Sequence, residues 1–393
     1  MEVTDLRIAL FSGNYNYVRD GANQSLNRLV GYLLKSGAAV RVYSPTVAEP
    51  DFAPTGDLVS VPSMAAPGRP EYRIPLRIGG KARADLDAFK PNLVHVSSPE
   101  FLGHAALGYA KMRKLPCIAS MHTRFETYPR YYGLAFLEPL VIALLRRFYR
   151  RCDAVVAPSE SMAQVLREQR MGFDIGIWTR GIERSVFNPG QRDMAWRRAQ
   201  GFADDDVVIG YFGRLVMEKG LDVFAESVDR LRRDGVKHKI LVIGEGPARD
   251  WFAARIPDAV FTGFLMGPEL GRAVAGMDVL LNPSTTEAFG NVTNEVMACG
   301  VPVVAARATG SSDLVHEGFT GYLIAPGAIH DMADALARYC TDPNLRARHG
   351  AASQEAASRY DWDAVNQALV DKYLRVVAAH ERGLGPPRLG PIP

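Results

Sequence analysis

Short apolar runs alternate with segments of helical periodicity through most of the chain. Between the first two runs, Leu26, Leu29, Val30 and Leu33 recur at helical spacing, and Gly37 ends the predicted helix. This alternation predicts a parallel sheet with helices on both faces. The strands predicted for the first half of the chain are residues 6–11, 40–43, 93–96, 117–121 and 154–157.

The series restarts after about residue 200, where Leu221, Phe224, Val228 and Leu231 mark one face of a helix. The fold class predicted is therefore α/β, with two doubly wound Rossmann-like domains that face a central cleft. The strands of the second series are 207–212, 239–243, 260–262, 278–282 and 303–306.

Turn-forming residues at Phe187–Gly190 mark the expected boundary between a domain of residues 1–190 and one of residues 191–360. An amphipathic helix is predicted within 361–381, from Trp362 to Ala379, and it could cross back to the first domain. Residues 382–393 are rich in glycine and proline, which predicts a disordered tail.

Composition fits a globular enzyme, with 47% hydrophobic and 23% charged residues. Residues 1–195 carry 25 Lys+Arg and 18 Asp+Glu, and residues 196–393 carry 21 and 25, so the halves have net charges of +7 and −4. This basic half could meet an anionic membrane surface, but its charge is too low to indicate nucleic acid binding.

Four scattered cysteines without a CxxC pair indicate reduced thiols, and no cluster has metal-ligand spacing. The first residues lead straight into a strand without a signal-peptide pattern. No apolar stretch reaches the roughly 20 residues that span a bilayer. We therefore expect a cytoplasmic protein, at most peripheral on the inner face of the membrane.

Two carboxylates, Glu287 and Glu295, stand eight residues apart around Phe289–Gly290, between two apolar runs. The order strand, loop, helix, strand places Glu287 in the loop and Glu295 on the helix, about one and a half turns in. Amides at the helix start could hold an anion, with one carboxylate on a sugar hydroxyl and the other on a ribose. The alternative is two surface glutamates beside a helix cap.

Arg214 and Lys219 flank a tight loop after the first strand of the second series. Two cations there would neutralise a diphosphate leaving group, the electrostatic contribution that usually dominates such catalysis. Solvated loop charges are the alternative, and the carboxylate pair on a later strand of the same sheet favours the functional interpretation.

Glycines follow strands at Gly244 and Gly246 and stand in the first loop at Gly21. Each lets the backbone approach a nucleotide, phosphate or sugar closely, although an ordinary strand-to-helix turn would need them as well. His122 ends a predicted strand and is expected to face the cleft, where it could exchange hydrogen bonds with a reacting sugar. His95 lies within a strand and is expected in the core.

Residues 135–151 are apolar first and basic last, with Arg146, Arg147, Arg150 and Arg151 beside Phe148 and Tyr149. A helix of this pattern could lie on an anionic bilayer, with roughly 1 kcal/mol from each basic residue. It could equally be a core helix whose last arginines complement its dipole.

Four motifs, in order and at matching spacing, make residues 5–380 resemble the GT-B glycosyltransferases of family 4, a retaining group that uses nucleotide sugars. The motifs are Phe212-Gly-Arg-Leu-Val-Met-Glu-Lys-Gly220, Ile243-Gly-Glu-Gly-Pro247, Asn282-Pro-Ser-Thr-Thr-Glu-Ala-Phe-Gly290 and Glu295-Val-Met-Ala-Cys-Gly-Val-Pro-Val-Val304.

This resemblance implies that Arg214 and Lys219 bind the donor diphosphate and that Glu287 holds sugar hydroxyls. The backbone of Phe289, Gly290 and Asn291 would touch sugar and phosphate, and Glu295 would bind the ribose. Gly21 would approach the diphosphate and His122 the donor sugar. The family often has a Gly-Gly pair where this chain has Gly21-Ala22.

Further stretches, 120–125, 131–133 and 178–182, look similar to sulfoquinovosyl diacylglycerol synthases and to mannosyltransferases that act on glycosyl-diacylglycerols. This narrower likeness places Arg124 and Tyr131 on the acceptor side and favours a lipid or glycolipid acceptor.

The predicted function is that of a retaining hexosyltransferase that uses a UDP- or GDP-linked sugar as co-substrate, with no bound cofactor and no metal requirement. Three alternatives stay open at this point. They are transfer to a polysaccharide or another soluble or polyprenyl-linked glycan, epimerisation of a nucleotide sugar on the same architecture, and binding of a nucleotide sugar without catalysis.

Overall fold

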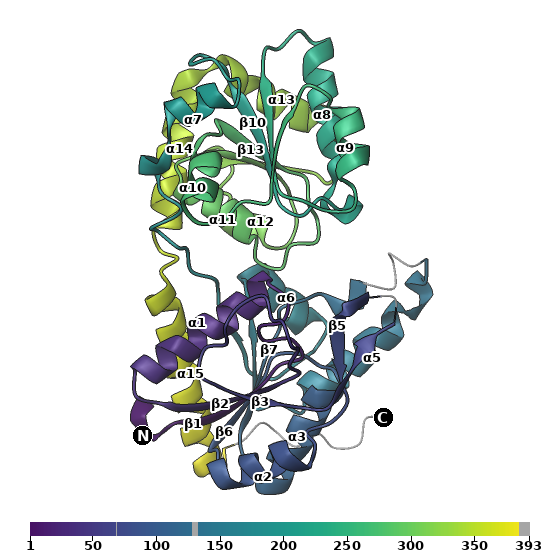
Figure 1. Ribbon diagram of the computed structural model, residues 1–393, viewed down its shortest axis with the longest axis vertical. Helices are drawn as coiled ribbons and strands as arrows, with labels where there is room; N and C mark the ends of the chain where they lie inside the picture. Colours follow the sequence, from purple (N-terminus) through teal and green to yellow (C-terminus); the bar gives the residue numbers. More distant parts are fainter. Residues whose placement is uncertain (68, 128–132, 385–393) are drawn as a thin grey trace. The chain divides into compact units, whose positions relative to one another are not determined.

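The computed structural model describes residues 1–67, 69–127 and 133–384, and the chain divides into two compact units (Figure 1). Unit 1 comprises Met1–Thr179 and Trp362–Pro393, and unit 2 comprises Arg180–Asp361. The boundary therefore lies before residue 190. The reason is that Ile182 and Phe187 are buried in the core of unit 2, so the turn-rich segment belongs to that unit.

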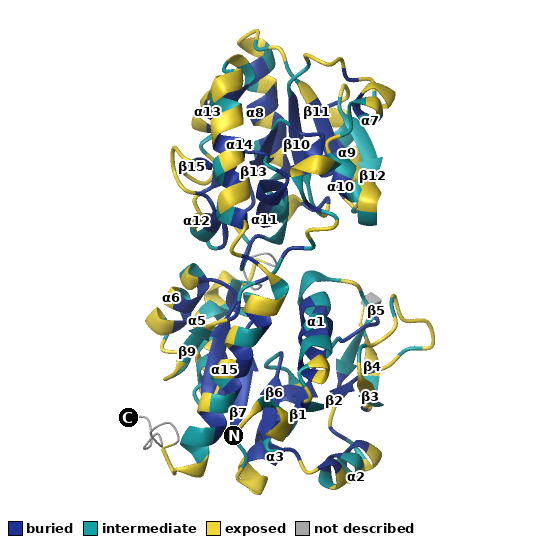
Figure 2. Ribbon diagram, turned by 90° about the vertical axis from the view of Figure 1, so that its left-hand side faces the viewer, coloured by how far each residue is buried: buried dark blue, intermediate teal, exposed yellow. Residues whose placement is uncertain are grey.

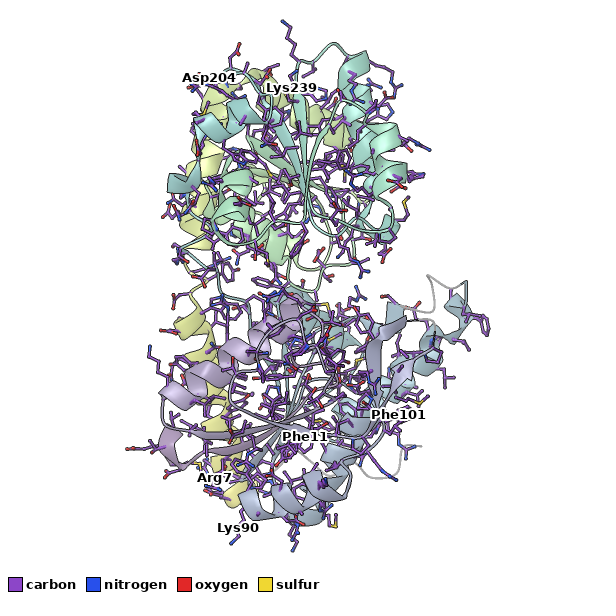
Figure 3. All side chains as sticks on the ribbon, viewed as in Figure 1. Arg7, Phe11, Lys90, Phe101, Asp204 and Lys239 are labelled. Atoms are coloured by element: carbon purple, nitrogen blue, oxygen red, sulfur yellow. The ribbon has the colours of Figure 1, made fainter. Side chains whose placement is uncertain are left out.

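Unit 1 contains a seven-stranded parallel sheet in the order β3-β2-β1-β6-β7-β8-β9. The inner strand β1 pairs with β2 and β6, and Leu10 stands opposite Val42 and His95. Figure 3 labels Arg7 and Phe11, the first and last residues of β1. The strands are β1 Arg7–Phe11, β2 Ala39–Ser44, β3 Asp57–Ser60, β6 Leu93–Val96, β7 Cys117–Ser120, β8 Ala154–Ala157 and β9 Ile175–Ile177, and an antiparallel hairpin is formed by β4 Ser63–Ala66 and β5 Arg69–Pro75.

The C-terminal helix α15, Trp362–Glu381, packs into unit 1 beside α1, Gly21–Lys35. Its Leu369, Val370 and Tyr373 are buried in one cluster with Leu26 and Leu29 of α1, because apolar residues at helical spacing face each other there. The other helices of unit 1 are α2 Gly80–Phe89, α3 Phe101–Arg113, α5 Glu138–Tyr149 and α6 Glu160–Glu168.

Unit 2 contains a six-stranded parallel sheet in the order β12-β11-β10-β13-β14-β15. Gly210 of the central strand stands opposite Leu241 and Leu280. The strands are β10 Val208–Phe212, β11 Lys239–Ile243, β12 Val260–Gly263, β13 Val279–Asn282, β14 Val303–Ala306 and β15 Gly321–Ile324. The helices are α7 Met194–Ala199, α8 Leu221–Arg233, α9 Arg249–Arg255, α10 Gly267–Ala275, α11 Asn291–Ala298, α12 Ser311–Leu314, α13 Ile329–Thr341 and α14 Pro343–Ala357.

Both faces of the unit 2 sheet are covered by helices. Helices α8, α9 and α13 pack with Ile209 and Val304 on one face, and α10 and α11 pack with Val208 and Leu280 on the other. Figure 2 accordingly shows the inner strands β10 and β13 mostly in dark blue, while the edge strand β12 is teal and the helices carry teal and yellow residues on their outer sides. Strands buried on both faces are continuous apolar runs, which is the pattern that the sequence displays.

Each sheet has one point where the strand order reverses, between β1 and β6 in unit 1 and between β10 and β13 in unit 2. The loops at the carboxyl ends of the strands diverge there, because the crossovers on either side go to opposite faces. Doubly wound proteins bind their ligands in the crevice formed at this point.

Candidate active site

In unit 2 two loops meet at the reversal point, one after β10 and the other after β13. Gly220 closes the first loop with φ of +75°, and a Cβ there would lie 3.1 Å from Pro283 of the second. Lys219 Nζ donates to Glu287 Oε1 at 2.6 Å and to Thr286 Oγ1 at 3.3 Å. The predicted cation and carboxylate are thus brought into direct contact.

Contacts with the loop after β14 hold Glu287 in place. Thr309 Oγ1 donates to the backbone carbonyl of Glu287 at 2.8 Å. Gly310 has φ of +81°, and a Cβ there would lie 2.8 Å from the carbonyl of Phe289, so only glycine fits without displacing that loop. The side chains of Lys219 and Glu287 remain 27% and 22% exposed, which leaves both reachable by a ligand.

Arg214 projects from the first loop as an exposed side chain. Within the described residues its guanidinium makes no ion pair or hydrogen bond, and only its backbone carbonyl is engaged, by Tyr211 Oη at 3.1 Å. Burial, with smaller effects of Glu287 and Glu218, raises the pKa of Tyr211, so its hydroxyl stays protonated as the donor of that bond. Arg214 adds a second positive charge to the loop that carries Lys219.

Helix α11 begins directly after this loop. Its N-cap, Gly290, is left-handed with φ of +93°, and no side chain caps the helix. The first amides of α11 are therefore open, and together with the helix dipole they favour an anion. Asn291 begins the helix and Glu295 stands half-buried on it, where its charge adds to burial in raising the pKa of Cys299 to about 12.

The two glycines after β11 have a role that the sequence does not reveal. A Cβ on Gly244 would lie 2.0 Å from the carbonyl oxygen of Gly213, and one on Gly246 would lie 2.3 Å from that of Leu215. The absence of side chains at Gly244 and Gly246 lets the loop after β11 pack against the loop that carries Arg214. A hydrogen bond from Leu215 N to Glu245 O, at 2.9 Å, also joins the two loops. The predicted approach of the two glycines to a nucleotide stays a prediction.

In unit 1 the reversal point holds a pocket of about 190 Å³. The loops after β1, β6 and β7 form it together with β5 and the start of α1, and its lining is rich in hydroxyl, amide and carboxylate groups. The lining residues are Ser12, Gly13, Asn14, Tyr17, Asp20, Ala22, Asn23, Leu26, Tyr72, Arg73, Ser97, Ser98, Glu100, His122, Thr123 and Phe125.

Glu100 is the residue of this pocket that the sequence analysis missed. Its Oε1 accepts from Ser98 Oγ at 2.5 Å, and a Cβ on Gly13 would lie only 1.6 Å from the same oxygen. Burial raises the pKa of Glu100, against the smaller opposing effect of Ser98. The signal was present in Ser97-Ser98-Pro99-Glu100, which directly follows a buried strand, as the Glu287 loop does in unit 2.

Gly21 is the first residue of α1, and the helix start is already occupied. Asp20 is the N-cap, and its carboxylate accepts from Asn23 N at 2.8 Å. A carboxylate in this position uses the amide and the dipole that would otherwise attract a phosphate. The approach of Gly21 to a diphosphate remains a prediction.

His122 lies in the pocket, with Nε2 at 2.8 Å from Ser120 Oγ and its ring edge-on to Trp178. Arg124 instead neutralises a buried carboxylate, since its Nε donates at 2.8 Å to Oε1 of the fully buried Glu126. Arg124 therefore has a structural role in this ion pair, and its predicted place on the acceptor side stays a prediction. Tyr131 lies outside the described residues.

Helix α5 and the turn before it, Ala135–Leu137, present a stripe of exposed apolar side chains. Phe136, Leu140 and Leu144 are 74%, 57% and 58% exposed, and Arg147 is exposed one turn further on. Arg146 donates to the carbonyl of Gln169 and Arg150 stacks on Phe173, so those two arginines are held by the protein.

Among the described residues no helix is long and apolar enough to cross a membrane. Over the same residues, no three His, Cys, Asp or Glu side chains gather in a group that could hold a metal ion. All four cysteines are free thiols.

Comparisons with known proteins identify the family and the fold. Residues 19–186 match the family model described as Glycosyltransferase Family 4, and residues 206–342 match Glycosyl transferases group 1. The sulfoquinovosyl transferase SQD2 of Arabidopsis thaliana is 30% identical over 374 residues, 92% of this chain and 72% of that protein. A GDP-mannose-dependent alpha-mannosyltransferase of Corynebacterium glutamicum is 27% identical, over 97% and 91% of the two chains.

An alpha-monoglucosyldiacylglycerol synthase of Streptococcus pneumoniae is 25% identical, over 84% of this chain and 77% of that protein. Among solved structures, sucrose-phosphate synthase from Thermosynechococcus elongatus has a TM-score of 0.75 at 19% identity, covering 95% and 99% of the chains. Anabaena Alr3699/HepE, in complex with UDP and glucose, has a TM-score of 0.70 at 19% identity, covering 94% and 99%. The architecture of two doubly wound units is thus shared with GT-B structures.

Proposed function

The chain belongs to family 4 of the glycosyltransferases, and on that premise we propose that it transfers a hexose from a nucleotide sugar to a hydroxyl group of a membrane lipid or glycolipid, with retention. The observation that carries the proposal is the loop pair of unit 2, where Lys219 contacts Glu287 at 2.6 Å beside the uncapped start of α11. Cations and open amides suit a diphosphate, and a carboxylate suits sugar hydroxyls.

In the proposed reaction Arg214, Lys219 and the amides after Gly290 hold the donor diphosphate. The bond between the anomeric carbon and the phosphate oxygen breaks, and the negative charge that develops on this oxygen is stabilised by the two cations. The acceptor oxygen bonds to the same face of the sugar, and its proton passes to the departing phosphate. Glu287 orients the sugar hydroxyls while its ion pair keeps Lys219 in position.

A donor screen by thermal shift tests the first half of this proposal. Binding to the folded state alone raises stability by RT ln(1 + [L]/Kd), so the right nucleotide sugar among UDP-, GDP- and ADP-linked donors stands out. The HepE complex and the GDP-mannose-dependent relative make UDP- and GDP-sugars the first choices. No shift with any of the donors would contradict the proposal.

The acceptor site is proposed to be the unit 1 pocket, and its charge points to a neutral hydroxylated headgroup. Asp20 and Glu100 line it, and among the described lining residues the only lysine or arginine is Arg73, whose guanidinium bonds Ser63. Carboxylates accept hydrogen bonds from hydroxyls but repel phosphate. The name of the pneumococcal relative includes diacylglycerol, a neutral lipid with a free hydroxyl group.

Diacylglycerol or a neutral glycosyl-diacylglycerol, compared with phosphatidylinositol, tests this acceptor class. We expect kcat/KM at least about tenfold higher for the neutral lipids, because a like charge in the pocket is costly. Transfer to soluble glycans alone would contradict the lipid assignment, and conversion of the donor with no acceptor present would identify an epimerase. The anomeric configuration of the product, read by NMR, tests retention.

We propose that the α5 stripe docks on an anionic membrane, since its apolar side chains adjoin exposed Arg147. Leu140→Asp/Leu144→Asp should abolish co-sedimentation with anionic vesicles. The matched control is Phe101→Asp/Met112→Asp, which places two acids at the exposed apolar positions of α3. Equal loss in both double variants, or binding that ignores anionic lipid, would contradict the proposal.

Because two side-chain cations are proposed to stabilise the leaving group, activity should survive EDTA. The measurement is the initial rate before and after chelation and after Mg²⁺ is restored. A strict requirement for a divalent ion would contradict this assignment of charge stabilisation.

A further inference from the structure

A continuous chain of hydrogen bonds runs through unit 1 from the C-terminal helix to the pocket. Tyr373 Oη of α15 lies 2.5 Å from His95 Nδ1 of β6. His95 Nε2 lies 2.8 Å from Ser120 Oγ of β7, and Ser120 Oγ lies 2.8 Å from His122 Nε2. The C-terminal helix is thereby linked through β6 and β7 to one pocket residue, His122.

The members behind His122 are sealed from water. Tyr373 and His95 are 0% exposed, and Ser120 is 1% exposed. The indole of Trp178 packs edge-on against both histidine rings, with centroids 6.2 Å from His95 and 5.7 Å from His122, which fixes the ring planes. No bulk water can therefore replace a hydrogen bond that the chain fails to make.

The protons in this chain can be placed by counting donors. Burial lowers the pKa of His95 to about 3 and raises that of Tyr373, so the imidazole is neutral and the phenol is protonated. Among the residues that the structure describes, the hydroxyl of Tyr373 has His95 as its one hydrogen-bond partner. A buried hydroxyl that does not donate a hydrogen bond destabilises the fold. Tyr373 therefore donates to Nδ1 of His95, whose own proton must lie on Nε2.

The same count continues outward. His95 Nε2–H donates to Ser120 Oγ, so the single proton of Ser120 is directed to its other partner, Nε2 of His122. The reverse polarity would leave the Tyr373 proton unbonded, and a proton on both histidine Nε2 atoms would leave that of Ser120 unbonded. Only one arrangement satisfies every buried donor.

We propose that Tyr373, His95 and Ser120 form a positioning chain that fixes the tautomer of His122, so that its imidazole accepts at Nε2 and carries its proton on Nδ1. The inference rests on the proposed function for its catalytic meaning, since that function places His122 in the acceptor pocket. His122 then serves as an N–H donor, and Nε2 is not available as a base. This agrees with the departing phosphate as the proton acceptor.

Histidine-selective ¹⁵N NMR tests the tautomer directly, and the chain has only eight histidines. The protonated and bare ring nitrogens of a neutral imidazole have widely separated shifts, and His122→Gln assigns the signal. We expect Nδ1–H at His122 in the wild type and a shift of the proton toward Nε2 in Ser120→Ala and Tyr373→Phe. A wild-type proton on Nε2 would overturn the proposal.

The matched control is Tyr339→Phe, because Tyr339 Oη makes the same kind of buried bond to His349 Nδ1, at 2.7 Å, in unit 2. It should leave the His122 signals unchanged. Ser120→Thr keeps the hydroxyl and should restore the wild-type tautomer, which separates the chain from a loss of fold. Unchanged His122 signals in a folded Ser120→Ala protein would also overturn the proposal.

Steady-state kinetics provide a second test of the positioning role. We expect Ser120→Ala to lower kcat roughly tenfold with little change in the KM of the donor, and Ser120→Thr to recover it, as for other groups that orient a functional histidine. Full kcat in Ser120→Ala would overturn the positioning role. If the tautomer of His122 is as stated but no sugar donor binds or reacts, the proposed function is wrong, whereas the positioning role of Tyr373, His95 and Ser120 is still supported.

Discussion

The two units place their candidate ligand loops at the same point of the same topology and equip it with different charged side chains. In unit 1 the carboxylate of Asp20 caps the N-terminus of the first helix, and Glu100 adds a second acid to the pocket. In unit 2, α11 starts at Gly290 with no side-chain cap, and Arg214 and Lys219 stand on the loop after β10. We therefore expect the switch point of unit 1 to disfavour anions and that of unit 2 to hold them.

This difference shows that the fold supplies the position of a site but not its chemistry. A doubly wound sheet always directs amides and loop residues to the reversal point. Whether a phosphate or a hydroxyl group binds there depends on a few side chains at the helix start. The proposed division into a donor unit and an acceptor unit rests on these few residues.

The largest effect on activity is expected when a cation of the unit 2 loop is removed. Lys219→Ala should lower kcat by roughly 10²–10³-fold, because it removes one stabilising charge from the leaving group. The fold should survive, since the side chain is 27% exposed. Steady-state rates and a thermal melt measure the two properties.

The control for this prediction is Lys239→Ala, which removes an exposed lysine of the same unit at the amino end of β11 (Figure 3). Lys219→Ala/Glu287→Gln separates loss of the cation from exposure of an unpaired carboxylate. Near-wild-type turnover of a folded Lys219→Ala protein would contradict the leaving-group assignment.

In unit 1, Glu100→Gln should lower kcat/KM for the acceptor by roughly 10–100-fold, because hydrogen bonds to a charged partner are each worth about 1.5–3 kcal/mol. Slow hydrolysis of the donor in the absence of acceptor should be unchanged. Glu160→Gln, which changes an exposed carboxylate paired with Arg167, is the control. An unaltered acceptor dependence would remove Glu100 from the site.

The helix cap of unit 1 gives a smaller effect. Asp20→Ala should lower the free energy of unfolding by about 1 kcal/mol, whereas Asp20→Asn should keep most of it, because asparagine caps a helix as well as aspartate. Chemical denaturation measures both variants. Equal stability of Asp20→Ala and the wild type would show that the α1 start does not depend on this carboxylate.

The smallest effect is a pH dependence of stability. The pKa of Glu100 is raised in the folded state by burial, so its contribution to stability is fully present below the unfolded pKa and is lost as pH rises through the folded value. Glu100→Gln should therefore raise Tm at pH 8 by about 2–4 °C if the relief is near 1 kcal/mol. The gain should vanish near pH 4, and a gain independent of pH would contradict the linkage.

Strands with continuous apolar runs could be predicted to within a residue or two, as at Leu93–Val96, Ala154–Ala157 and Lys239–Ile243. The strands β3, β4, β5, β9 and β15 were missed. For the edge strands β9 and β15 the reason is that Ile-Gly-Ile and Gly-Tyr-Leu-Ile are short and carry glycine. That Lys219 and Glu287 lie at the same edge of the sheet could be predicted because each follows such a run. Glu100 follows one too, but a single acid after a strand has no partner in sequence to single it out.

The sequence by itself determined the elements that depend on local periodicity, and through them the two parallel sheets and the strand ends at which the candidate sites lie. Only the tertiary structure decided which groups meet: Lys219 with Glu287, Arg124 with Glu126, and Tyr373 with His95 across 278 positions of the chain. The physical reason is that periodicity is a property of neighbouring residues. A hydrogen bond or an ion pair needs two groups within about 3 Å, and packing of the whole unit sets that distance.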